Sequence, residues 1–412
     1  MEKLTYIIAG GGCSGLSLAC ELAERLHTSS QIIIVDRERK SSNDRTWCFW
    51  AEKTIFPPSL IHHSWPNMSF AASGSLHKES ISPFNYYMIR SADWYAHMWH
   101  RLSAYPNVRF VPGNINRIEE DQESPYIVVD GQIIRGDWVL NSVVPARGKE
   151  SRYPVFRLWQ HFTGWWVRTD EPVFDATDAR LMDFRTAQHG DTRFVYVLPF
   201  SDREALIEYT IFSKDLLKAG DYEKGLRTYM KDFFPNVGYQ IEEREGGKIP
   251  MTNASFERYR SDHVINVGTV GGAVKPTTGY AFLRIQQESK YIAQQLLTGK
   301  RVADVHSSAA RFAFYDRLLL HILSNRGEKG ASIFAALFRS NPMSRILTFL
   351  NEDSNLLQEA LIFSRLPYAP FLRALVKECW IAGFKKSAPV SMSSSVWHPT
   401  DNPLTTKQSP TI

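Results

Sequence analysis

Three glycines near the N-terminus have the types and spacing needed to hold a nucleotide. Gly10, Gly12 and Gly15 form a G-x-G-x-x-G turn between a short apolar strand, 6–9, and a segment from residue 16 that favours a helix. Gly10 permits the tight turn, Gly12 lets the backbone approach a pyrophosphate, and Gly15 lets helix and strand pack closely. The helix N-terminus presents free N–H groups and positive dipole to the phosphates.

An acidic residue completes this pattern. The apolar strand 31–35 ends in Asp36, which follows Gly15 by 21 residues, where a carboxylate would accept the ribose hydroxyls of an adenosine. The alternative is an ordinary glycine-rich turn with a carboxylate at the end of the next strand. Because spacing, strand context and N-terminal position agree, the sequence favours a dinucleotide site.

Composition limits the class of protein. The chain has 412 residues, which indicates two domains with a helical addition, and 43% hydrophobic and 22% charged residues, which is typical of globular proteins. Its net charge of +5 is scattered, so we expect no nucleic-acid partner, although a mildly basic protein suits an anionic membrane face. The four cysteines lack metal-ligand spacing, so we expect reduced thiols and no metal site. We find no secretory signal and no run of 18 apolar residues that would span a bilayer.

The order of predicted elements indicates a discontinuous nucleotide-binding domain. We assign it residues 1–50, 85–150 and 255–300, and we assign 51–84 and 151–254 to a β-rich substrate domain. Residues 301–385 read as helical, and 386–412, rich in Ser, Pro and Thr, as a disordered tail. The main expected elements are helices at 93–102, 222–234 and 279–297, strands at 108–111, 137–140, 156–168, 193–200, 204–212 and 263–268, and a hairpin turning at Asp130-Gly131.

The cofactor is indicated by the late strand, turn and helix at 264–283, which return to the nucleotide domain after the β-rich insert. This layout resembles the two-domain flavoproteins of the aromatic-hydroxylase type. The resemblance implies an α/β fold, with a Rossmann-type FAD-binding domain and an inserted antiparallel substrate domain. It also implies that Gly268, Thr269 and Gly279 lie near the flavin. The hydroxylases carry Gly-Asp where this chain has Gly268-Thr269, so a carboxylate contact to the ribityl chain is not expected here.

Several segments resemble a narrower family, the bacterial lycopene β-cyclases, and together they cover about residues 4 to 380. They are Asp44-Arg45-Thr46-Trp47-Cys48-Phe49-Trp50, 156–162, 206–210, 271–280 and 314–319. The resemblance implies a carotenoid cyclase that isomerises the ψ ends of lycopene to β-ionone rings, giving γ-carotene and then β-carotene without net redox change. It further implies reduced FAD as cofactor, NAD(P)H as external reductant, and lycopene and related acyclic carotenoids as substrates.

Such a reaction protonates C2 of the chain end, closes a ring on the cation at C1 and removes the proton of C6. Glu208 is the acid that we expect to take part. In the strand 205–212 it shares a face with Leu206, Thr210 and Phe212, and an apolar face raises the pKa of a carboxyl group. The alternative is that Glu208 faces solvent or pairs with an arginine such as Arg185 or Arg203.

Other candidates keep two interpretations each. Trp159, Phe162, Trp165 and Trp166 could line a polyene tunnel or a plain sheet core. His161 is an acid–base candidate or a hydrogen-bonded structural residue. Asp44, Arg45 and Trp47 either take part in the chemistry or belong to a structural loop that holds the flavin domain to the substrate domain. Lys275 either lies near the flavin or is solvated.

An insoluble C40 substrate implies a cytoplasmic protein bound peripherally at the inner face of the cell membrane. The mixture of apolar and basic residues in 301–385 is similar to interfacial helices, or it forms a helical cap on the second domain. The resemblance also allows other carotenoid enzymes as partners. The rival functions are a redox flavoenzyme of the same fold, either a monooxygenase or an isoprenoid reductase, and a non-catalytic carotenoid carrier.

Overall fold

A parallel sheet organises the N-terminal part of this computed structural model, which describes residues 3–144, 155–303 and 310–384, with side chains as far as 378. Its strands, in spatial order, are β18 (Tyr259–Ser261), β19 (Val264–Asn266), β12 (Trp138–Asn141), β1 (Thr5–Ala9), β2 (Gln31–Asp36) and β8 (Val108–Pro112). All neighbours are parallel except β18, which pairs antiparallel with β19. The isoleucine-rich runs of β1 and β2 are buried because this sheet is covered on both faces.

Helices cover one face of the parallel sheet and a small sheet covers the other. The helices are α1 (Cys13–Ala23), α2 (Ser91–Leu102) and α4 (Phe282–Leu297), and their apolar residues share one core with β1 and β2. The antiparallel strands β9 (Ile115–Glu120), β10 (Pro125–Val129) and β11 (Gln132–Arg135) close the other face. The predicted turn at Asp130-Gly131 joins β10 to β11, and both residues have positive φ.

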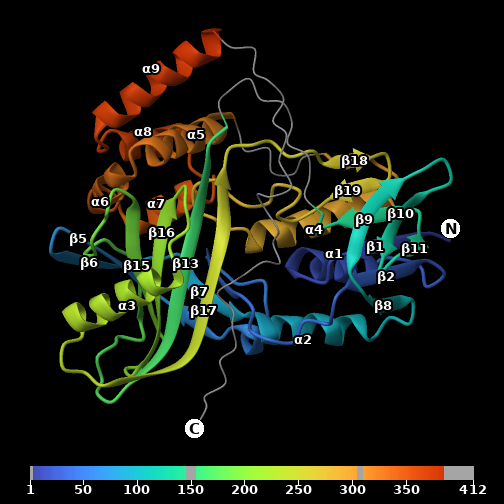
Figure 1. Ribbon diagram of the computed structural model, residues 1–412, viewed down its shortest axis with the longest axis horizontal. Helices are drawn as coiled ribbons and strands as arrows, with labels where there is room; N and C mark the ends of the chain where they lie inside the picture. Colours follow the sequence, from blue (N-terminus) through green and yellow to red (C-terminus); the bar gives the residue numbers. More distant parts are fainter. Residues whose placement is uncertain (1–2, 145–154, 304–309, 385–412) are drawn as a thin grey trace.

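A larger sheet forms the second half of the molecule, drawn mainly in green at the left of Figure 1. Its strands, in spatial order, are β17 (Tyr239–Thr252), β13 (Arg157–Thr169), β16 (Glu204–Ser213), β15 (Thr192–Pro199), β14 (Asp178–Asp183), β5 (Asn67–Ala72) and β6 (Ser75–Ser80). Neighbouring strands are antiparallel except β14 and β5. Helix α3 (Ala219–Phe233) covers one face through a core that includes Trp165, Ile207 and Tyr229.

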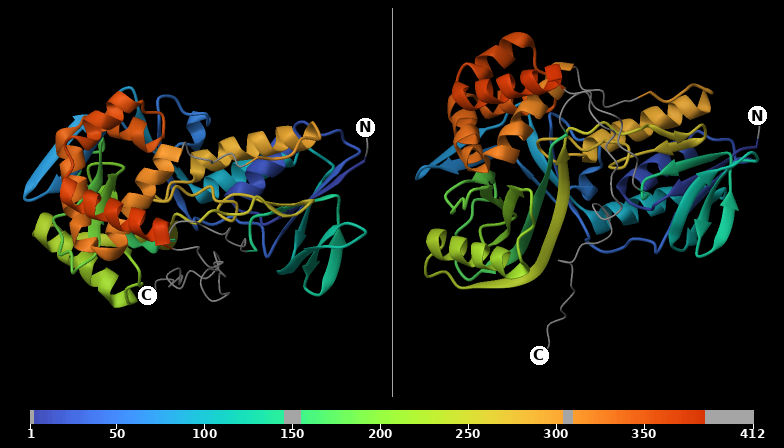
Figure 2. Two further views of the ribbon diagram at one scale, coloured as in Figure 1. Left: turned by 90° about the horizontal axis from the view of Figure 1, so that it is seen from above. Right: turned by 45° about the horizontal axis from the view of Figure 1, so that its top comes forward.

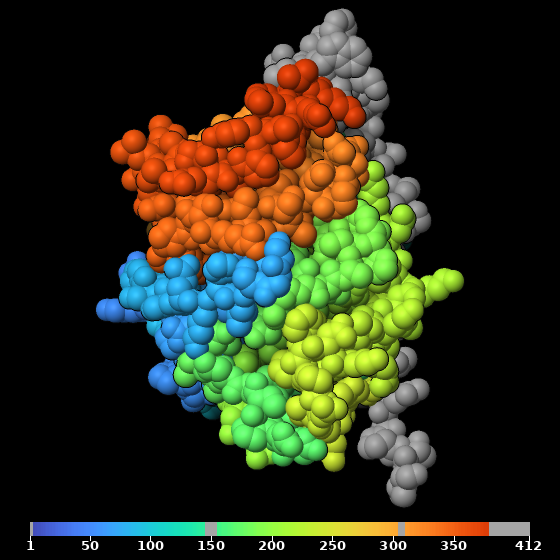
Figure 3. Space-filling model, turned by 90° about the vertical axis from the view of Figure 1, so that its left-hand side faces the viewer, coloured from blue at the N-terminus to red at the C-terminus, as the bar shows by residue number. Residues whose placement is uncertain are grey.

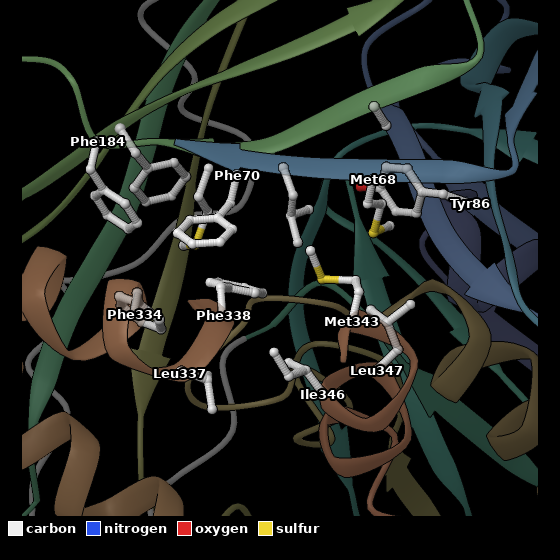
Figure 4. Packing of buried hydrophobic residues seen from close by; sticks show 14 of the residues in the cluster. Met68, Phe70, Tyr86, Phe184, Phe334, Leu337, Phe338, Met343, Ile346 and Leu347 are labelled. Carbon is white, nitrogen blue, oxygen red and sulfur yellow. The ribbon is translucent and has the colours of Figure 1, made fainter. Parts of the chain in front are cut away.

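The C-terminal helices cover the opposite face of the large sheet. They are α5 (Ala310–Asn325), α6 (Gly330–Ser340), α7 (Met343–Leu350), α8 (Leu356–Phe363) and α9 (Tyr368–Phe384). Both views of Figure 2 show them stacked beside this half of the molecule. Figure 4 shows Phe338 of α6 opposite Phe70 of β5, Phe334 of α6 opposite Phe184, and Met343 of α7 on the side of Met68 of β5. The predicted helical region is thus present over its described residues, while the tail 386–412 lies outside them.

A small sheet and a 3-10 turn lie between the halves. Strands β3 (Thr46–Ala51), β7 (Asn85–Arg90) and β4 (His63–Trp65) form a three-stranded antiparallel sheet, and a single 3-10 turn, Pro58–Leu60, precedes β4. Phe49 and Trp50, adjacent on β3, belong to different cores, one under the parallel sheet and one under the large sheet. Strand β3 therefore joins the two halves.

Candidate active site

The first glycine turn has the geometry that its spacing predicts. Gly10 has φ +107, and a Cβ there would collide with Ser142. A Cβ on Gly15 would collide with the carbonyl oxygen of Gly10, because α1 packs directly against the end of β1. Both positions therefore require glycine for local packing alone.

The same turn leaves open space where a phosphate group is expected. A Cβ on Gly12 would meet no atom within 4 Å, and no side chain caps α1 at this residue. The buried hydroxyl of Ser14, next in the turn, has no hydrogen-bond partner among the described residues. Uncapped N–H groups, a free hydroxyl and a gap beside the backbone fit a pyrophosphate.

Asp36 lies at the end of β2 and faces this turn. One carboxylate oxygen accepts a hydrogen bond from the backbone N–H of Gly11 at 2.8 Å, and the other accepts one from Arg37 at 2.7 Å. The carboxylate thus stands beside the glycine turn, where a ribose bound there would reach it.

The late turn meets the early one, although 254 positions separate Gly268 from Ser14. Gly268 has φ +61, and a Cβ there would lie 2.5 Å from the Cβ of Ser14. The buried Glu288 of α4 accepts a hydrogen bond from the Gly268 N–H at 2.8 Å and pairs with Arg258. Thr269, the next residue, is half-buried. The two turns therefore form one continuous surface.

Gly279 lies at the other end of the 271–280 segment and contacts the large sheet. It has φ +72, and a Cβ there would lie 2.7 Å from the amide oxygen of Gln160 and 3.2 Å from Ile249. The helix expected to begin at Gly279 begins instead at Phe282, because this left-handed residue belongs to the preceding turn. Trp47 of β3 stacks on Phe282, with ring centroids 5.0 Å apart, and so holds the start of α4.

A cavity of about 480 Å³ opens beside the start of α4. Cys48, Trp50 and Tyr280 form one part of its wall, and the turn 350–353 forms another. The buried indole N–H of Trp50 has no hydrogen-bond partner among the described residues. The wall of the cavity thus combines aromatic faces with a hydrogen-bond donor, the Trp50 indole N–H, that has no partner among the described residues.

Glu208 lies near two residues of this cavity wall, Cys48 and Tyr280, whose pKa values its charge raises. It is half-buried on β16, on the same face as Leu206 and Phe212, as the strand alternation predicts. Burial and the nearby charge of Glu245 raise its pKa from 4.5 to about 8, opposed by a 2.6 Å hydrogen bond from the Thr210 hydroxyl. The arginines considered as partners lie elsewhere, since Arg185 pairs with Asp183 and Arg203 donates to a backbone carbonyl. Glu208 is therefore a carboxyl group that can hold a proton near neutral pH.

A second carboxyl group, which sequence reasoning missed, faces the same point. Gly164 of β13 is in register with Glu208 on one side and with Glu245 of β17 on the other. Glu245 accepts hydrogen bonds from the Thr46 hydroxyl at 2.7 Å and the Trp166 indole at 3.0 Å. Burial raises the pKa of Glu245, while these two donors lower it.

An irregularity in β17 explains why Glu245 was missed. The register between β13 and β17 shifts between Trp166 and Val167, so Glu242 is left as an extra residue. Ile241, before the shift, packs on the α3 side, whereas Glu245, after it, faces the opposite core. Simple alternation would place both on one face, and the only signal in the sequence is the charged run 242–245 inside a strand.

Two tyrosines lie near Glu208, and a third is hydrogen-bonded to one of them. Tyr196 of β15 is its cross-strand neighbour, and Tyr86 and Tyr280 share a 2.9 Å hydrogen bond between their hydroxyls. Burial is the main cause that raises the pKa of Tyr196 and Tyr280, and the charge of Glu208 adds to it. These rings provide electron-rich faces around the carboxyl group.

The structure decides between the two interpretations given above for His161, Trp165 and Trp166. His161 is buried between the hydroxyls of Tyr222 and Ser213, 2.5 and 2.8 Å away, and burial lowers its pKa to about 4, so it is a structural residue. Trp165 lies in the core under α3. Trp166 lies on the Glu208 face, stacked on Phe200.

The loop before β3 and Lys275 have structural partners. Asp44 pairs with Lys40 and accepts a hydrogen bond from Tyr95 at 2.9 Å. Of the two alternatives for Lys275, the solvated one is wrong, because its ammonium group is buried between Asp316, at 3.1 Å, and Glu352, at 2.8 Å. These carboxylates, one on α5 and one in the turn after α7, hold the ammonium group inside the protein.

Comparison with known families identifies the chain's relatives. The sequence profile described as Lycopene cyclase protein matches residues 6–376. The chain belongs to the lycopene cyclase family. A lycopene beta-cyclase of Pseudescherichia vulneris is 24% identical over 293 residues, covering 67% of this chain and 69% of that protein. A chloroplastic neoxanthin synthase of Solanum lycopersicum is 23% identical, covering 72% of this chain and 61% of that protein.

Solved structures share the fold of this lycopene cyclase family member. A flavoprotein/dehydrogenase from Cytophaga hutchinsonii superposes with a TM-score of 0.57 at 11% identity, covering 92% of this chain and all of that one. The p-nitrophenol 4-monooxygenase PnpA from Pseudomonas putida DLL-E4 gives 0.51 at 14% identity, covering 93% of this chain and all of that one. The predicted fold class, an aromatic-hydroxylase-like α/β fold with C-terminal helices, is confirmed.

Proposed function

We propose that this chain is a lycopene β-cyclase that converts the ψ end groups of lycopene to β-ionone rings without net redox change. The observation that carries the proposal is Glu208, a carboxyl group with a pKa of about 8 on an apolar sheet face, near Tyr280 and Cys48 in the wall of the cavity. Membership of the lycopene cyclase family supports the substrate class.

Glu208 supplies the proton in this proposal. Its neutral carboxyl group donates to C2 of the chain end, which leaves a tertiary cation at C1. The C5=C6 bond attacks C1 and closes the ring, and loss of the C6 proton forms the β double bond. The faces of Tyr280 and Trp50 stabilise the passing cation and exclude water from it.

We assign FAD binding to the two joined turns. Gly10, Gly12 and Gly15 would hold the pyrophosphate, Asp36 the ribose, and Gly268, Thr269 and Gly279 the flavin side, in the part of the chain built on the parallel sheet. Reduced FAD, once bound, supplies an electron-rich, negatively charged face near the developing cation. NAD(P)H is the proposed external reductant. The seven-stranded sheet is the proposed substrate domain.

Product analysis tests the function. The parent chain and Glu208→Gln would each be expressed in lycopene-accumulating cells, with Glu242→Gln, an exposed carboxylate on β17, as the control. We expect ringed products of unchanged mass from the parent and the control, and a loss of 10² to 10⁴-fold in Glu208→Gln. Added oxygen or hydrogen would indicate a redox flavoenzyme, and unaltered lycopene bound to folded protein a carrier. Either result would overturn the proposal.

We propose α8 and α9 as the membrane-contacting surface. Figure 3 shows these helices, in red, at the outer edge of the molecule. Tyr368, Leu372 and Val376 follow one stripe of α9 and are 61, 58 and 68% exposed, and Leu357 and Leu361 of α8 are 78 and 53% exposed.

Charge favours an anionic lipid surface over other occupants. Arg365, Arg373 and Lys377 are exposed on this surface, whereas its two acidic residues, Glu359 and Glu378, are buried against α5. An apolar stripe flanked by cations matches a helix lying among acidic headgroups. Within the described residues, none of the helices combines the length and apolar character needed to cross a bilayer.

Vesicle sedimentation tests this surface. Leu372→Asp/Val376→Asp would be compared with Leu76→Asp, an exposed leucine on β6 that is 46% exposed. We expect the α9 variant to lose binding to vesicles containing phosphatidylglycerol while Leu76→Asp retains it. Equal binding by both variants, or equal binding of the parent to neutral vesicles, would contradict the assignment.

A further inference from the structure

We propose that Glu245 is the base that removes the C6 proton, so that acid and base are two separate carboxyl groups facing each other across Gly164. This inference rests on the proposed cyclisation and adds a residue and a division of roles to it.

The sheet register brings the two groups to one place. Glu208 and Glu245 lie on strands two apart, about 10 Å between Cα atoms for regular strand spacing, with Gly164 directly between them. A Cβ on Gly164 would lie 3.0 Å from Cδ1 of Leu206, 3.1 Å from Cγ of Glu245 and 3.6 Å from Cβ of Glu208. The side chain of Glu245 therefore lies over the glycine, next to the base of the Glu208 side chain, and any larger residue at position 164 would push against both.

Hydrogen bonding divides the roles. One oxygen of Glu245 accepts both the Thr46 and the Trp166 hydrogen bonds, and donors directed at a carboxylate favour its anion. Glu208 accepts a hydrogen bond from the Thr210 hydroxyl. The negative charge of Glu245 helps to raise the pKa of Glu208, so we assign the proton of the pair to Glu208.

The reaction needs this division because two different carbons exchange protons. The O–H bond of Glu208 breaks and its proton forms the C2–H bond with the electron pair of C1=C2. The pair of C5=C6 then forms the C1–C6 bond and leaves the positive charge at C5. Glu245 takes the C6 proton, the C6–H pair becomes C5=C6, and passage of the proton to Glu208 restores the starting state.

The position of the base also selects the product. A cation at C5 can lose a proton from C6, from C4 or from the methyl group on C5, and each loss gives a different ring of the same mass. Because C2 and C6 are both bonded to C1 in the ring, two carboxyl groups over one glycine can serve both carbons. Glu245 thus determines that the ring is of the β type.

The test uses ring type and pH dependence, which a merely structural role would not change. Full-length parent, Glu245→Gln, Glu208→Gln, and the control Glu242→Gln would be assayed on lycopene in vesicles with reduced FAD. We expect Glu245→Gln to form β rings 10² to 10⁴-fold more slowly, with residual rings carrying the double bond at C4 or on the methyl carbon. Glu242→Gln should match the parent.

The pH profile gives a second readout. The parent should lose activity as the pH rises through about 8, when Glu208 ionises. Without the negative charge of Glu245, this decline should move toward lower pH by about one unit. The groups that face the pair are Cys48, Tyr196 and Tyr280 around Glu208, and Arg90 and Glu243 around Glu245, and all of them are unchanged in the variant.

The outcomes separate this inference from the proposed function. If the parent forms no rings, the cyclase assignment itself fails. If the parent and Glu245→Gln both form β rings at similar rates with the same pH profile, only the role of Glu245 is overturned. Should Glu245→Gln not fold, Gly164→Ala inserts a methyl group between two intact carboxyl groups, and slower cyclisation with altered ring type is expected. Unchanged β-ring formation in Gly164→Ala would overturn the inference.

Discussion

Alanine substitutions at three glycines separate cofactor binding from folding. Gly268→Ala places a methyl group 2.5 Å from the Cβ of Ser14 at a residue with φ +61. The left-handed backbone costs an alanine about 1 to 2 kcal/mol, and the overpacking adds about 1 to 3 kcal/mol. The free energy of unfolding should therefore fall by about 2 to 5 kcal/mol.

Gly74→Ala is the matched control for strain. Gly74 has φ +79 in the turn between β5 and β6, and a Cβ there would meet no atom within 4 Å. Only the left-handed cost of about 1 to 2 kcal/mol applies. The difference between the two variants measures the contact between the early and late turns.

Gly12→Ala should change the affinity for FAD without changing the stability of the FAD-free protein. Gly12 has φ −85 and open space around its Cβ position. The poorer helix cap and the stiffer unfolded chain each contribute less than about 1 kcal/mol with opposite signs, so the FAD-free protein should keep its stability. The methyl group would occupy the gap proposed for the pyrophosphate, and FAD affinity should fall at least 10-fold, or about 1.4 kcal/mol.

Urea unfolding of the FAD-free variants and FAD titration by flavin fluorescence measure both quantities. Added FAD should raise the stability of the parent and of Gly74→Ala, but much less that of Gly12→Ala. If Gly12→Ala binds FAD like the parent, the assignment of the pyrophosphate site is wrong. If Gly268→Ala unfolds no more easily than Gly74→Ala, the packing argument is refuted.

Two further predictions concern buried charge. Because the folded state raises the pKa of Glu208 above its ordinary value, the stability that its neutral form contributes is complete below about pH 4.5 and is lost as the pH rises through 8. Glu208→Gln should therefore raise the free energy of unfolding by up to about 5 kcal/mol at pH 8 and have little effect at pH 4.5. Equal effects in urea unfolding at both pH values would contradict this. Lys275→Met leaves Asp316 and Glu352 without their shared cation and should destabilise the protein by about 3 to 5 kcal/mol, whereas Lys290→Met, exposed on α4, should not, as thermal unfolding would show.

The sequence predicted local features well because their causes are local. The positive φ of Gly10 and the tight packing of Gly15 follow from a turn whose spacing is visible in fifteen residues. The face of Glu208 follows from alternation within one strand. The late turn could be matched to the early one through the resemblance, and their contact at Ser14 bears out that pairing in space.

Features that depend on the pairing of several strands could not be predicted from the sequence. The position of Glu245 requires the register of β17 on β13, the register of β13 on β16, and the extra residue at Glu242, and no one segment encodes all three. The burial of Lys275 likewise depends on carboxylates 41 and 77 positions away. Charged residues in a strand read as solvated unless their partners are known.

The place of β19 in the parallel sheet constrains how the protein matures on the ribosome. Strand β12 pairs with β1 on one side and with β19 on the other, although β1 ends at Ala9 and β19 begins at Val264. The late turn at Gly268 and the helix α4 follow β19, so the site proposed for FAD is incomplete until residue 297 has emerged. The first glycine turn, 10–15, is synthesised early, but it meets the late turn only after all strands of the large sheet have been synthesised. If FAD binds at the proposed site, its loading is a late event. A nascent chain stalled before β19 would carry an unpaired sheet edge, which promotes aggregation.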